Sequence, residues 1–453
     1  MSAYTPAERD AVLSLAGIFS LRMVGLFMIL PVFAVYGAGL DGATPLLIGL
    51  AVGAYGLAQL CLQIPFGLLA DRHDRRLLIM IGLLLFVAGG LVAAASSSIW
   101  GVIAGRFLQG AGAISAVVMA LLSDLVREEN RTKAMATVGM SIGVSFALAF
   151  VAGPLLADAF GLGGLFLSTA VMGLAALLLC AWRVPRVRQP QRQLPPHYGA
   201  HLLGMLRHPE LMRLNAGIFS LHLVMTACFV ALPPLLVAAG LPASRHGWLY
   251  LPVMLLAFVA LVPAVIVAEK HRRMREVYLA AILLLALAML ALAAAHQGLG
   301  ALVASVALFF FAFNLLEALL PSLVSKTSPA GGKGTAMGIY STSQFLGAFL
   351  GGVVGGALQG LHGVTLLFLA LAGLVLAWMA VAGRMAQPAY LHSVALRLEA
   401  GAPDEVLLEG LRVLPGVEEL TVLPDDEIIY LKVDKARWQE DALRQWPVKI
   451  ISA

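Results

Sequence analysis

The sequence predicts an all-α polytopic membrane protein that ends in a small α+β domain. Of its 453 residues, 60% are hydrophobic and only 12% are charged, which is about half the charged fraction of an ordinary soluble domain. Apolar runs of roughly twenty residues, the length that crosses a bilayer as a helix, recur between short polar breaks. This pattern stops near Leu391, where a charged segment with short alternating apolar stretches begins.

Twelve apolar runs are long enough to cross a membrane as helices. The first ten residues include Glu8 and Asp10, which do not fit a cleaved signal peptide, so we expect the first run to remain as a helix. The expected spans are 11–36, 46–70, 77–97, 99–125, 132–158, 162–182, 209–238, 246–268, 276–296, 299–324, 335–360 and 363–385.

Lysine and arginine residues gather in alternate loops between these spans, and the opposite loops contain only Arg245. The positive-inside rule places the basic loops and both termini in the cytoplasm, and an even number of spans gives the same orientation. The basic loops hold Arg72, Arg75 and Arg76; Arg127, Arg131 and Lys133; Arg183, Arg186, Arg188, Arg192 and Arg207; Lys270, Arg272, Arg273 and Arg275; and Lys326 and Lys333.

The chain divides into two groups of six spans that resemble each other. A linker rich in Pro, Gln and Arg at 184–208 separates an N-terminal half, 1–183, from a C-terminal half, 209–387. The hexapeptide Gly17-Ile-Phe-Ser-Leu-Arg22 recurs as Gly217-Ile-Phe-Ser-Leu-His222 in the corresponding span. Many secondary transporters are built from repeats of this kind around a site near the bilayer midplane.

The C-terminal segment, 391–453, predicts a ferredoxin-like domain. It carries seven Lys/Arg against twelve Asp/Glu, whereas the rest of the chain is strongly basic. Its pattern predicts the order βαββαβ, and it has no cysteine that could bind a metal. The expected elements are a strand through Val394, Leu396 and Leu398, a helix over 403–414, strands over 417–422 and 428–433, a helix over 435–446 and a strand from Val448.

Four short motifs lie in the N-terminal half. They are Gly25-Leu-Phe-Met-Ile-Leu-Pro31-Val-Phe in the first span, Gly67-x3-Asp71-Arg72-x-x-Arg75-Arg76 after the second, Arg106-Phe-Leu-Gln109-Gly110 in the fourth, and Gly143 followed by Gly153-Pro154 in the fifth. Together with twelve spans in two halves, these motifs resemble the major facilitator superfamily and its drug:proton antiporters. With the added C-terminal domain, the chain resembles the YajR subgroup. One position departs from the family pattern, because Asp74 stands where glycine is usual.

The resemblance implies a conformational latch at the loop after the second span. In the family, the Asp of this motif lies near the N-terminus of the eleventh span, which places Asp71 beside residues 334–336. A carboxylate at a helix N-terminus is stabilised by up to about 1 kcal/mol. The alternative is that the arginines only set topology, which leaves Asp71 and Gly67 unexplained. The expected latch residues are Gly67, Asp71, Arg72, Arg75, Arg76, Asp124 and Arg131.

Ionisable residues inside apolar spans are costly, roughly 3 kcal/mol each, and are therefore functional candidates. Glu317 in the tenth span is the leading proton-carrier candidate, because an apolar environment disfavours the charged form of a carboxyl group. The other proton-coupling candidates are Arg106, which the resemblance associates with this role, Arg22, and His222 at the matching position of the repeat. The alternative is a permanent ion pair between Glu317 and one of these residues.

Polar and aromatic side chains at helical spacing suggest the wall of a substrate cavity, although such stripes also mark helix packing. The candidates are Tyr55, Gln59, Gln109, Thr226, Phe229, Asn314, Tyr340 and Gln344. Gly143, Gly153 and Pro154 form the motif expected to pack helices closely.

The sequence therefore predicts a proton-coupled antiporter of the bacterial inner membrane that exports small or drug-like compounds. Its expected partners are a small-molecule substrate, protons and the lipid bilayer, with a small ligand or self-association at the C-terminal domain. We expect no enzymatic activity, cofactor, metal or nucleic acid. Two alternatives stay open, namely a membrane sensor that signals through the C-terminal domain and a carrier for metabolite uptake.

Overall fold

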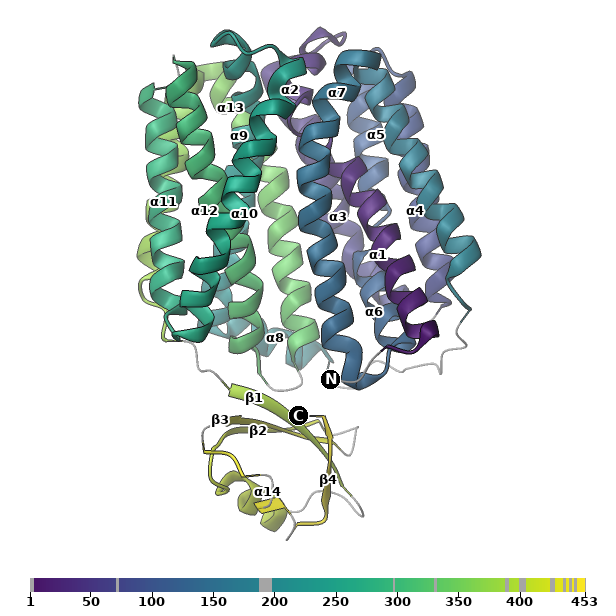
Figure 1. Ribbon diagram of the computed structural model, residues 1–453, viewed down its shortest axis with the longest axis vertical. Helices are drawn as coiled ribbons and strands as arrows, with labels where there is room; N and C mark the ends of the chain where they lie inside the picture. The colour runs from purple at the N-terminus through teal and green to yellow at the C-terminus, as the bar shows by residue number, and fades with distance from the viewer. Residues whose placement is uncertain are drawn as a thin grey trace.

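The computed structural model describes residues 4–70, 73–186, 198–295, 298–329, 332–387, 391–398, 405–423, 428–434, 437–439, 442–443 and 446–452. It consists of a helical bundle with a small sheet domain at one end (Figure 1). We call that end, where the first residues of the chain also lie, the terminal end, and the opposite one the far end.

The helices of the bundle follow the order expected from the sequence. The N-terminal half comprises α1 (Pro6–Phe27), α2 (Phe33–Tyr36), α3 (Pro45–Ala70), α4 (Arg75–Ala95), α5 (Ile99–Ala111), α6 (Ser115–Leu125) and α7 (Glu128–Arg183). The C-terminal half comprises α8 (Tyr198–Arg207), α9 (Pro209–Ala238), the 3-10 turn η2 (Ala243–Arg245), α10 (His246–Lys270), α11 (Met274–Ala295), α12 (Leu299–Thr327) and α13 (Lys333–Ala382).

Twelve membrane passes are present, as predicted, although two helices each provide two of them. Ten helical segments of the described residues are long and apolar enough to cross a bilayer, with α5 and α6 together counted as one, and the segments in α7 and α13 run for 51 and 50 residues. A straight helix of that length would measure about 75 Å, more than twice the hydrocarbon thickness. Each instead reverses at a glycine with positive φ, Gly161 in α7 and Gly363 in α13, a conformation that glycine adopts without steric cost.

Two predicted spans are less regular than expected. The first helix begins at Pro6 because Thr5 and Glu8 form a capping box, and it ends at Phe27 rather than continuing to residue 36. The fourth span is broken between α5 and α6, where residues 112–114 leave the helix. Both breaks lie inside apolar sequence, where hydrophobic length alone does not reveal them.

The two halves meet closely toward the far end. A Cβ atom on Gly49 or Gly53 of α3 would lie 2.0 or 2.6 Å from a backbone oxygen of α13, that of Gly352 or Phe349 respectively. Such distances leave room only for glycine, so the two backbones are in direct contact. On the opposite side of the bundle, α10 contacts α7 at Gly247, whose Cβ position lies 3.1 Å from the Val151 carbonyl oxygen.

Aromatic side chains from both halves fill the space behind these contacts. Phe150 of α7 packs edge-on against Phe229 of α9, Tyr250 of α10 and Phe310 of α12, with ring centroids 5.0, 5.3 and 5.7 Å apart. All four rings are fully buried. The far end of the bundle is therefore closed by a layer of aromatic rings and by glycine-mediated backbone contacts.

The same helices separate toward the terminal end. A Cβ atom built on Gly67 of α3, Gly143 of α7, or Gly334 or Gly338 of α13 would meet no heavy atom within 4 Å. In Figure 1, α7 and α10 approach each other near the top and diverge toward the sheet domain. The bundle is thus closed at the far end and spread at the terminal end.

The C-terminal domain has the predicted ferredoxin-like sheet. It contains β1 (Leu391–Leu398), α14 (Glu405–Arg412), β2 (Val417–Leu423), β3 (Ile428–Asp434) and β4 (Val448–Ser452), with strand order β2-β3-β1-β4 and antiparallel pairing throughout. Because β3 lies between β1 and β2 and pairs with both, β1-α14-β2 is a split βαβ unit. The alternation predicted for β1 is confirmed, because Val394, Leu396 and Leu398 lie in the domain core.

The second helix of this domain, expected over 435–446, is not formed by the described residues there. Residues 437–439 and 442–443 form a turn, irregular chain and a 3-10 turn, and the rest of that segment lies outside the described residues except for Trp446, which is in a bend. Trp446, an aromatic residue of this segment, packs against α14. A Cβ on Gly410 of α14 would lie 2.0 Å from the Trp446 ring, so this ring sits directly on the helix backbone.

Candidate functional site

Polar side chains form two clusters inside the apolar bundle, one in each half. The N-terminal cluster is built around two arginines, and the C-terminal cluster is built around one glutamate. We call them the arginine cluster and the glutamate cluster. The arginine cluster comprises Arg22, Tyr55, Gln59, Arg106, Gln109, Ser115 and Thr169, and the glutamate cluster comprises His222, Asn314, Glu317, Tyr340 and Gln344.

Arg22 of α1 is buried, with 1% of its surface exposed, and its guanidinium is held by neutral groups. It donates hydrogen bonds to the Tyr55 hydroxyl at 2.6 Å, the Gly112 carbonyl at 2.9 Å and the Ser115 hydroxyl at 3.1 Å. The break between α5 and α6 places Gly112 outside regular helix, which leaves its carbonyl oxygen available to the arginine. The irregular fourth span therefore has a direct role in holding this buried charge.

Arg106 of α5 lies near the ring of the same tyrosine and is 2% exposed. It donates to the Ala51 carbonyl at 3.4 Å and to Gln109 Oε1 at 3.1 Å. The two guanidinium carbons of Arg22 and Arg106 lie 5.8 and 5.3 Å from the centre of the Tyr55 ring, within the range of cation–π attraction. The arginine cluster thus holds two cations around one aromatic ring, and all of these contacts are to neutral groups.

The glutamate cluster joins α9, α12 and α13. The Gln344 amide nitrogen lies 2.8 Å from His222 Nε2 and donates to Glu317 Oε1 at 3.4 Å. His222 Nε2 lies 3.9 Å from the other carboxylate oxygen, Oε2. The Glu317 side chain is 37% exposed, whereas that of His222 is 9% exposed. The Glu317 side chain is therefore more exposed than that of His222, although its Oε2 atom is itself buried.

Some polar atoms of the glutamate cluster have unused hydrogen-bonding capacity. Within the described part of the chain, Asn314 Nδ2, Glu317 Oε2 and the Tyr340 hydroxyl have no hydrogen-bond partner, although each is buried. Buried polar groups are nearly always hydrogen-bonded. These three atoms are therefore available to polar groups of a bound compound.

Several residues predicted to line a cavity are instead packed inside a half. Tyr55, Gln59 and Gln109 belong to the arginine cluster, and Gln59 donates to the Gly110 carbonyl at 2.8 Å. Thr226 and Phe229 of α9 are also buried, and Phe229 belongs to the aromatic layer that closes the far end. The expectation that these five residues border an open cavity is not met in this conformation, because hydrophobic periodicity does not distinguish a cavity wall from a helix interface.

Four of the residues expected to form the latch make described contacts within the N-terminal half. Arg75 forms an ion pair with Asp124 and also donates to the carbonyls of Ala70 at 3.2 Å and Ala120 at 3.0 Å. These contacts join the end of α3 to the start of α4 and to α6. Arg76 donates to the Ala181 carbonyl of α7, and Arg131 donates to the Ser123 carbonyl at 3.0 Å. Asp71 and Arg72 lie outside the described residues.

The departure of this motif from the family pattern has a local explanation. Asp74 is the N-cap of α4, and its carboxylate accepts a hydrogen bond from the Arg76 backbone N–H at 2.9 Å. Aspartate is a favoured N-cap residue because it satisfies an otherwise unpaired helix N–H and complements the helix dipole. The negative charge beside the arginines thus stabilises the start of α4.

The predicted packing motif in the fifth span divides into two parts. The Cβ position of Gly153 lies 2.3 Å from the Met28 carbonyl oxygen, so α7 touches the end of α1 at this point, next to Pro154. Gly143, by contrast, has no heavy atom within 4 Å of its Cβ position. Close packing is therefore present at Gly153 and is not seen at Gly143 in this conformation.

Sequence reasoning missed one buried carboxylate, Glu8. It accepts hydrogen bonds from the Arg127 backbone N–H and Nε, both at 2.9 Å, and from the Asn130 amide at 3.4 Å. These bonds fasten the start of α1 to the start of α7. The Thr5-x-x-Glu8 pattern reveals the helix start, but the partner in a distant loop has no local sequence signal.

Comparisons with known proteins agree with this architecture. The family profile described as the Major Facilitator Superfamily matches residues 15–267 and 214–401. The chain is 47% identical over 448 residues to the inner membrane transport protein YajR of Escherichia coli (strain K12), which covers 97% of this chain and 98% of that protein. It is 25% identical over 346 residues to the multidrug resistance protein MdtH of Shigella flexneri, covering 74% and 83% of the two chains.

Solved structures show the same fold at low sequence identity. The D-xylose-proton symporter superposes with a TM-score of 0.66 at 16% identity, covering 84% of this chain and 98% of that one. The nucleoside transporter NupG superposes with a TM-score of 0.67 at 14% identity, covering 82% and 98% of the two chains.

Proposed function

The chain belongs to the major facilitator superfamily of membrane transporters, and on that premise we propose that it is a proton-coupled antiporter. It exports small compounds across the bacterial inner membrane by alternating access, with both termini in the cytoplasm. The inner-membrane location is supported by the 47% identical relative, an inner membrane transport protein, and the orientation by the distribution of Lys and Arg.

The observation that carries the proposal is the setting of Glu317. It is the only Asp or Glu in the middle of a predicted span, and its side chain is partly exposed, contacts α9 and α13, and has one buried oxygen without a described hydrogen-bond partner. A proton carrier needs such a group, which can take up a proton from one side and release it after the surroundings change. A permanent ion pair would instead require a partner that is always charged, whereas the described partner of Glu317 within 4 Å is His222, at 3.9 Å, which is a cation only when it is protonated.

The conformation of the bundle supports alternating access. With the terminal end in the cytoplasm, a bundle closed at the far end and spread at the terminal end is inward-facing. Gly67 and Gly334, the residues on either side of the proposed latch, both have open space around them. We propose that Asp71 engages residues 334–336 only when the terminal end closes, so that the latch belongs to the outward-facing state.

The buried charges suggest what kind of compound is carried. The middle of the spans contains two arginines and one glutamate, so the interior is net positive whether or not Glu317 holds a proton. In a low-dielectric interior this charge repels cations strongly. We therefore propose that the exported compound is neutral or anionic, which narrows the earlier expectation of drug-like compounds.

A substrate screen in sealed vesicles tests the proposed function. Purified protein is reconstituted with a panel of neutral, anionic and cationic compounds, and uptake or release is measured with and without an imposed pH gradient. The proposal expects gradient-dependent movement of a neutral or anionic compound. Equal transport rates with and without the pH gradient would exclude proton coupling. Transport of cationic compounds would exclude the proposed class of substrate.

A further inference from the structure

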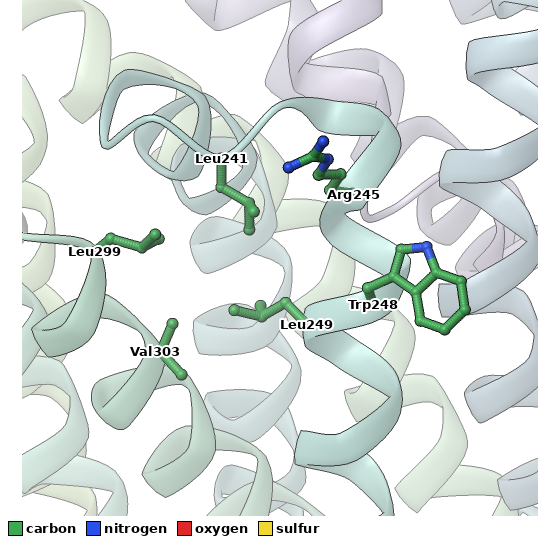
Figure 2. A pocket seen from close by; sticks show the side chains of 6 residues that line it. All are labelled: Leu241, Arg245, Trp248, Leu249, Leu299 and Val303. Atoms are coloured by element: carbon green, nitrogen blue, oxygen red, sulfur yellow. The ribbon is translucent and has the colours of Figure 1, made fainter.

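The far end of the C-terminal half contains a groove that the transport mechanism above does not use. Its volume is about 310 Å³, and it lies between the loop before α10, the first turn of α10 and the first turn of α12 (Figure 2). This volume is at the lower limit for ligand pockets, so it accommodates part of one elongated molecule. The lining residues are Leu241, Arg245, Trp248, Leu249, Leu299 and Val303.

The groove has one charged end and otherwise apolar walls. Figure 2 shows Arg245 at its upper rim, with Leu249 and Val303 lower in the groove. Arg245 is exposed, and within the described residues its guanidinium has no hydrogen-bond or ion-pair partner. It is also the only Lys or Arg in the loops at this end of the bundle. A ligand that fits this groove therefore combines an anionic head with an apolar chain.

The position of the groove indicates a lipid rather than a soluble anion. Trp248 is 72% exposed beside it, and tryptophan at a helix end is typical of the membrane interface. Below the groove, α10 continues with the outward-facing apolar residues Leu255, Leu256 and Val259, along which an acyl chain can extend. An inorganic anion would occupy only the Arg245 end and leave the apolar walls without a partner.

We propose that this groove binds one anionic phospholipid of the outer leaflet, with its phosphate on Arg245 and one acyl chain between α10 and α12. The proposal requires only that the far end faces the outer leaflet and does not depend on proton coupling. A lipid held here also contacts α10 immediately beside Gly247, where α10 meets Val151 of α7. Lipid binding therefore stabilises the closed far end and favours the inward-facing state.

Lipid binding by the purified full-length protein tests the site directly. Native mass spectrometry measures binding of phosphatidylglycerol and phosphatidylcholine to the wild type, Arg245→Gln, Arg245→Lys and Arg273→Gln, the last being an exposed cation at the terminal end. We expect the wild type to prefer phosphatidylglycerol by about fivefold, corresponding to about 1 kcal/mol for one interfacial cation. Arg245→Gln should lose this preference, and Arg245→Lys and Arg273→Gln should keep it.

A second variant separates the apolar groove from the cation. Val303→Trp fills the groove and should weaken binding of both lipids, whereas Arg245→Gln removes only the preference for the anionic one. Equal binding of both lipids by the wild type, or unchanged phosphatidylglycerol binding by Val303→Trp, would overturn the proposal. Displacement of phosphatidylglycerol by inorganic phosphate would also overturn it, because the site would then recognise the free anion.

The effect on conformation is measured separately. Spin labels at Thr44, just before α3, and at His362, next to the reversal of α13 at Gly363, report closure of the far end by double electron–electron resonance. The labels are introduced in a Cys61→Ser background, because Cys61 is the exposed cysteine of the described residues. Phosphatidylglycerol nanodiscs should increase the short-distance population relative to phosphatidylcholine nanodiscs in the wild type and not in Arg245→Gln. The same increase in both proteins would refute coupling of this site to closure.

Discussion

The amide nitrogen of Gln344 on α13 lies 3.4 Å from a carboxylate oxygen of Glu317 on α12. The same nitrogen lies 2.8 Å from His222 on α9, so one side chain joins three helices of the C-terminal half around an acidic group. The arginine cluster in the other half has no comparable acid. The polar clusters of the two halves therefore differ in chemistry, even though the hexapeptides around Arg22 and His222 are repeats.

The glycine contacts at the far end predict a conformational shift. In Gly49→Ala, the new Cβ atom would lie 2.0 Å from the Gly352 carbonyl oxygen, so α3 and α13 must move apart. We expect an increased outward-facing population, measured as faster labelling of a far-end cysteine by a membrane-impermeant reagent. Gly139→Ala on α7 is the matched control, because its Cβ position is open. Equal labelling rates in the two variants would contradict the observed seal.

The Arg75–Asp124 ion pair predicts a stability effect. Arg75 is buried and Asp124 is exposed enough to be partly solvated, so Asp124→Asn removes the negative charge that faces a buried guanidinium. We expect a loss of about 1–3 kcal/mol in unfolding free energy, seen as a lower midpoint in thermal unfolding. The double variant Arg75→Gln/Asp124→Asn should lose less than the sum of the two single losses. Strict additivity would show that the pair does not couple energetically.

Tyr55→Phe tests the arginine cluster. This change removes the hydroxyl that accepts hydrogen bonds from Arg22 and Gln59, while it keeps the aromatic ring near Arg22 and Arg106. We expect destabilisation of about 1–3 kcal/mol, because buried donors lose their acceptor. Thermal unfolding provides the measurement, and Tyr36→Phe in the shorter helix α2 serves as the control. A stability equal to wild type would mean that the hydroxyl contacts contribute nothing net.

Truncation after Gln387 distinguishes a transporter from a sensor. The ferredoxin-like domain has its own core of apolar residues, distinct from those of the bundle, so the bundle should insert and transport without it. We expect substrate movement in vesicles to persist in the truncated protein. Complete loss of transport, with normal expression and folding, would favour the alternative in which the C-terminal domain is the output of the protein.

The sequence was sufficient to predict the structural features that depend on the length and periodicity of apolar runs. The twelve passes, the two halves and the strands of the C-terminal sheet follow from such patterns, and Glu317 was identified because a charge inside an apolar span is conspicuous. The groups that a given buried side chain contacts could not be predicted in the same way. That Arg22 contacts the Gly112 carbonyl, or that Glu8 contacts Arg127, depends on helix breaks and on loops far apart in the chain.

The expected second helix of the C-terminal domain shows a different limit of prediction from local sequence. Its residues have good helix propensity, yet Trp438 and Trp446 pack against glycine backbones of the domain, and these tertiary contacts override the local preference. Likewise, the helical spacing of Tyr55 and Gln59 correctly indicated a shared face. It could not indicate that this face is turned toward two arginines and not toward a cavity.

The most direct test of the central claim is substrate-driven proton flux through the Glu317→Gln protein in sealed vesicles, using the compound identified by the screen and Glu276→Gln, at the start of α11, as a control. If Glu317 carries the proton, the flux should fall to that of protein-free vesicles, while Glu276→Gln retains it and Glu317→Gln still exchanges substrate for substrate. Undiminished proton flux in Glu317→Gln would contradict the account.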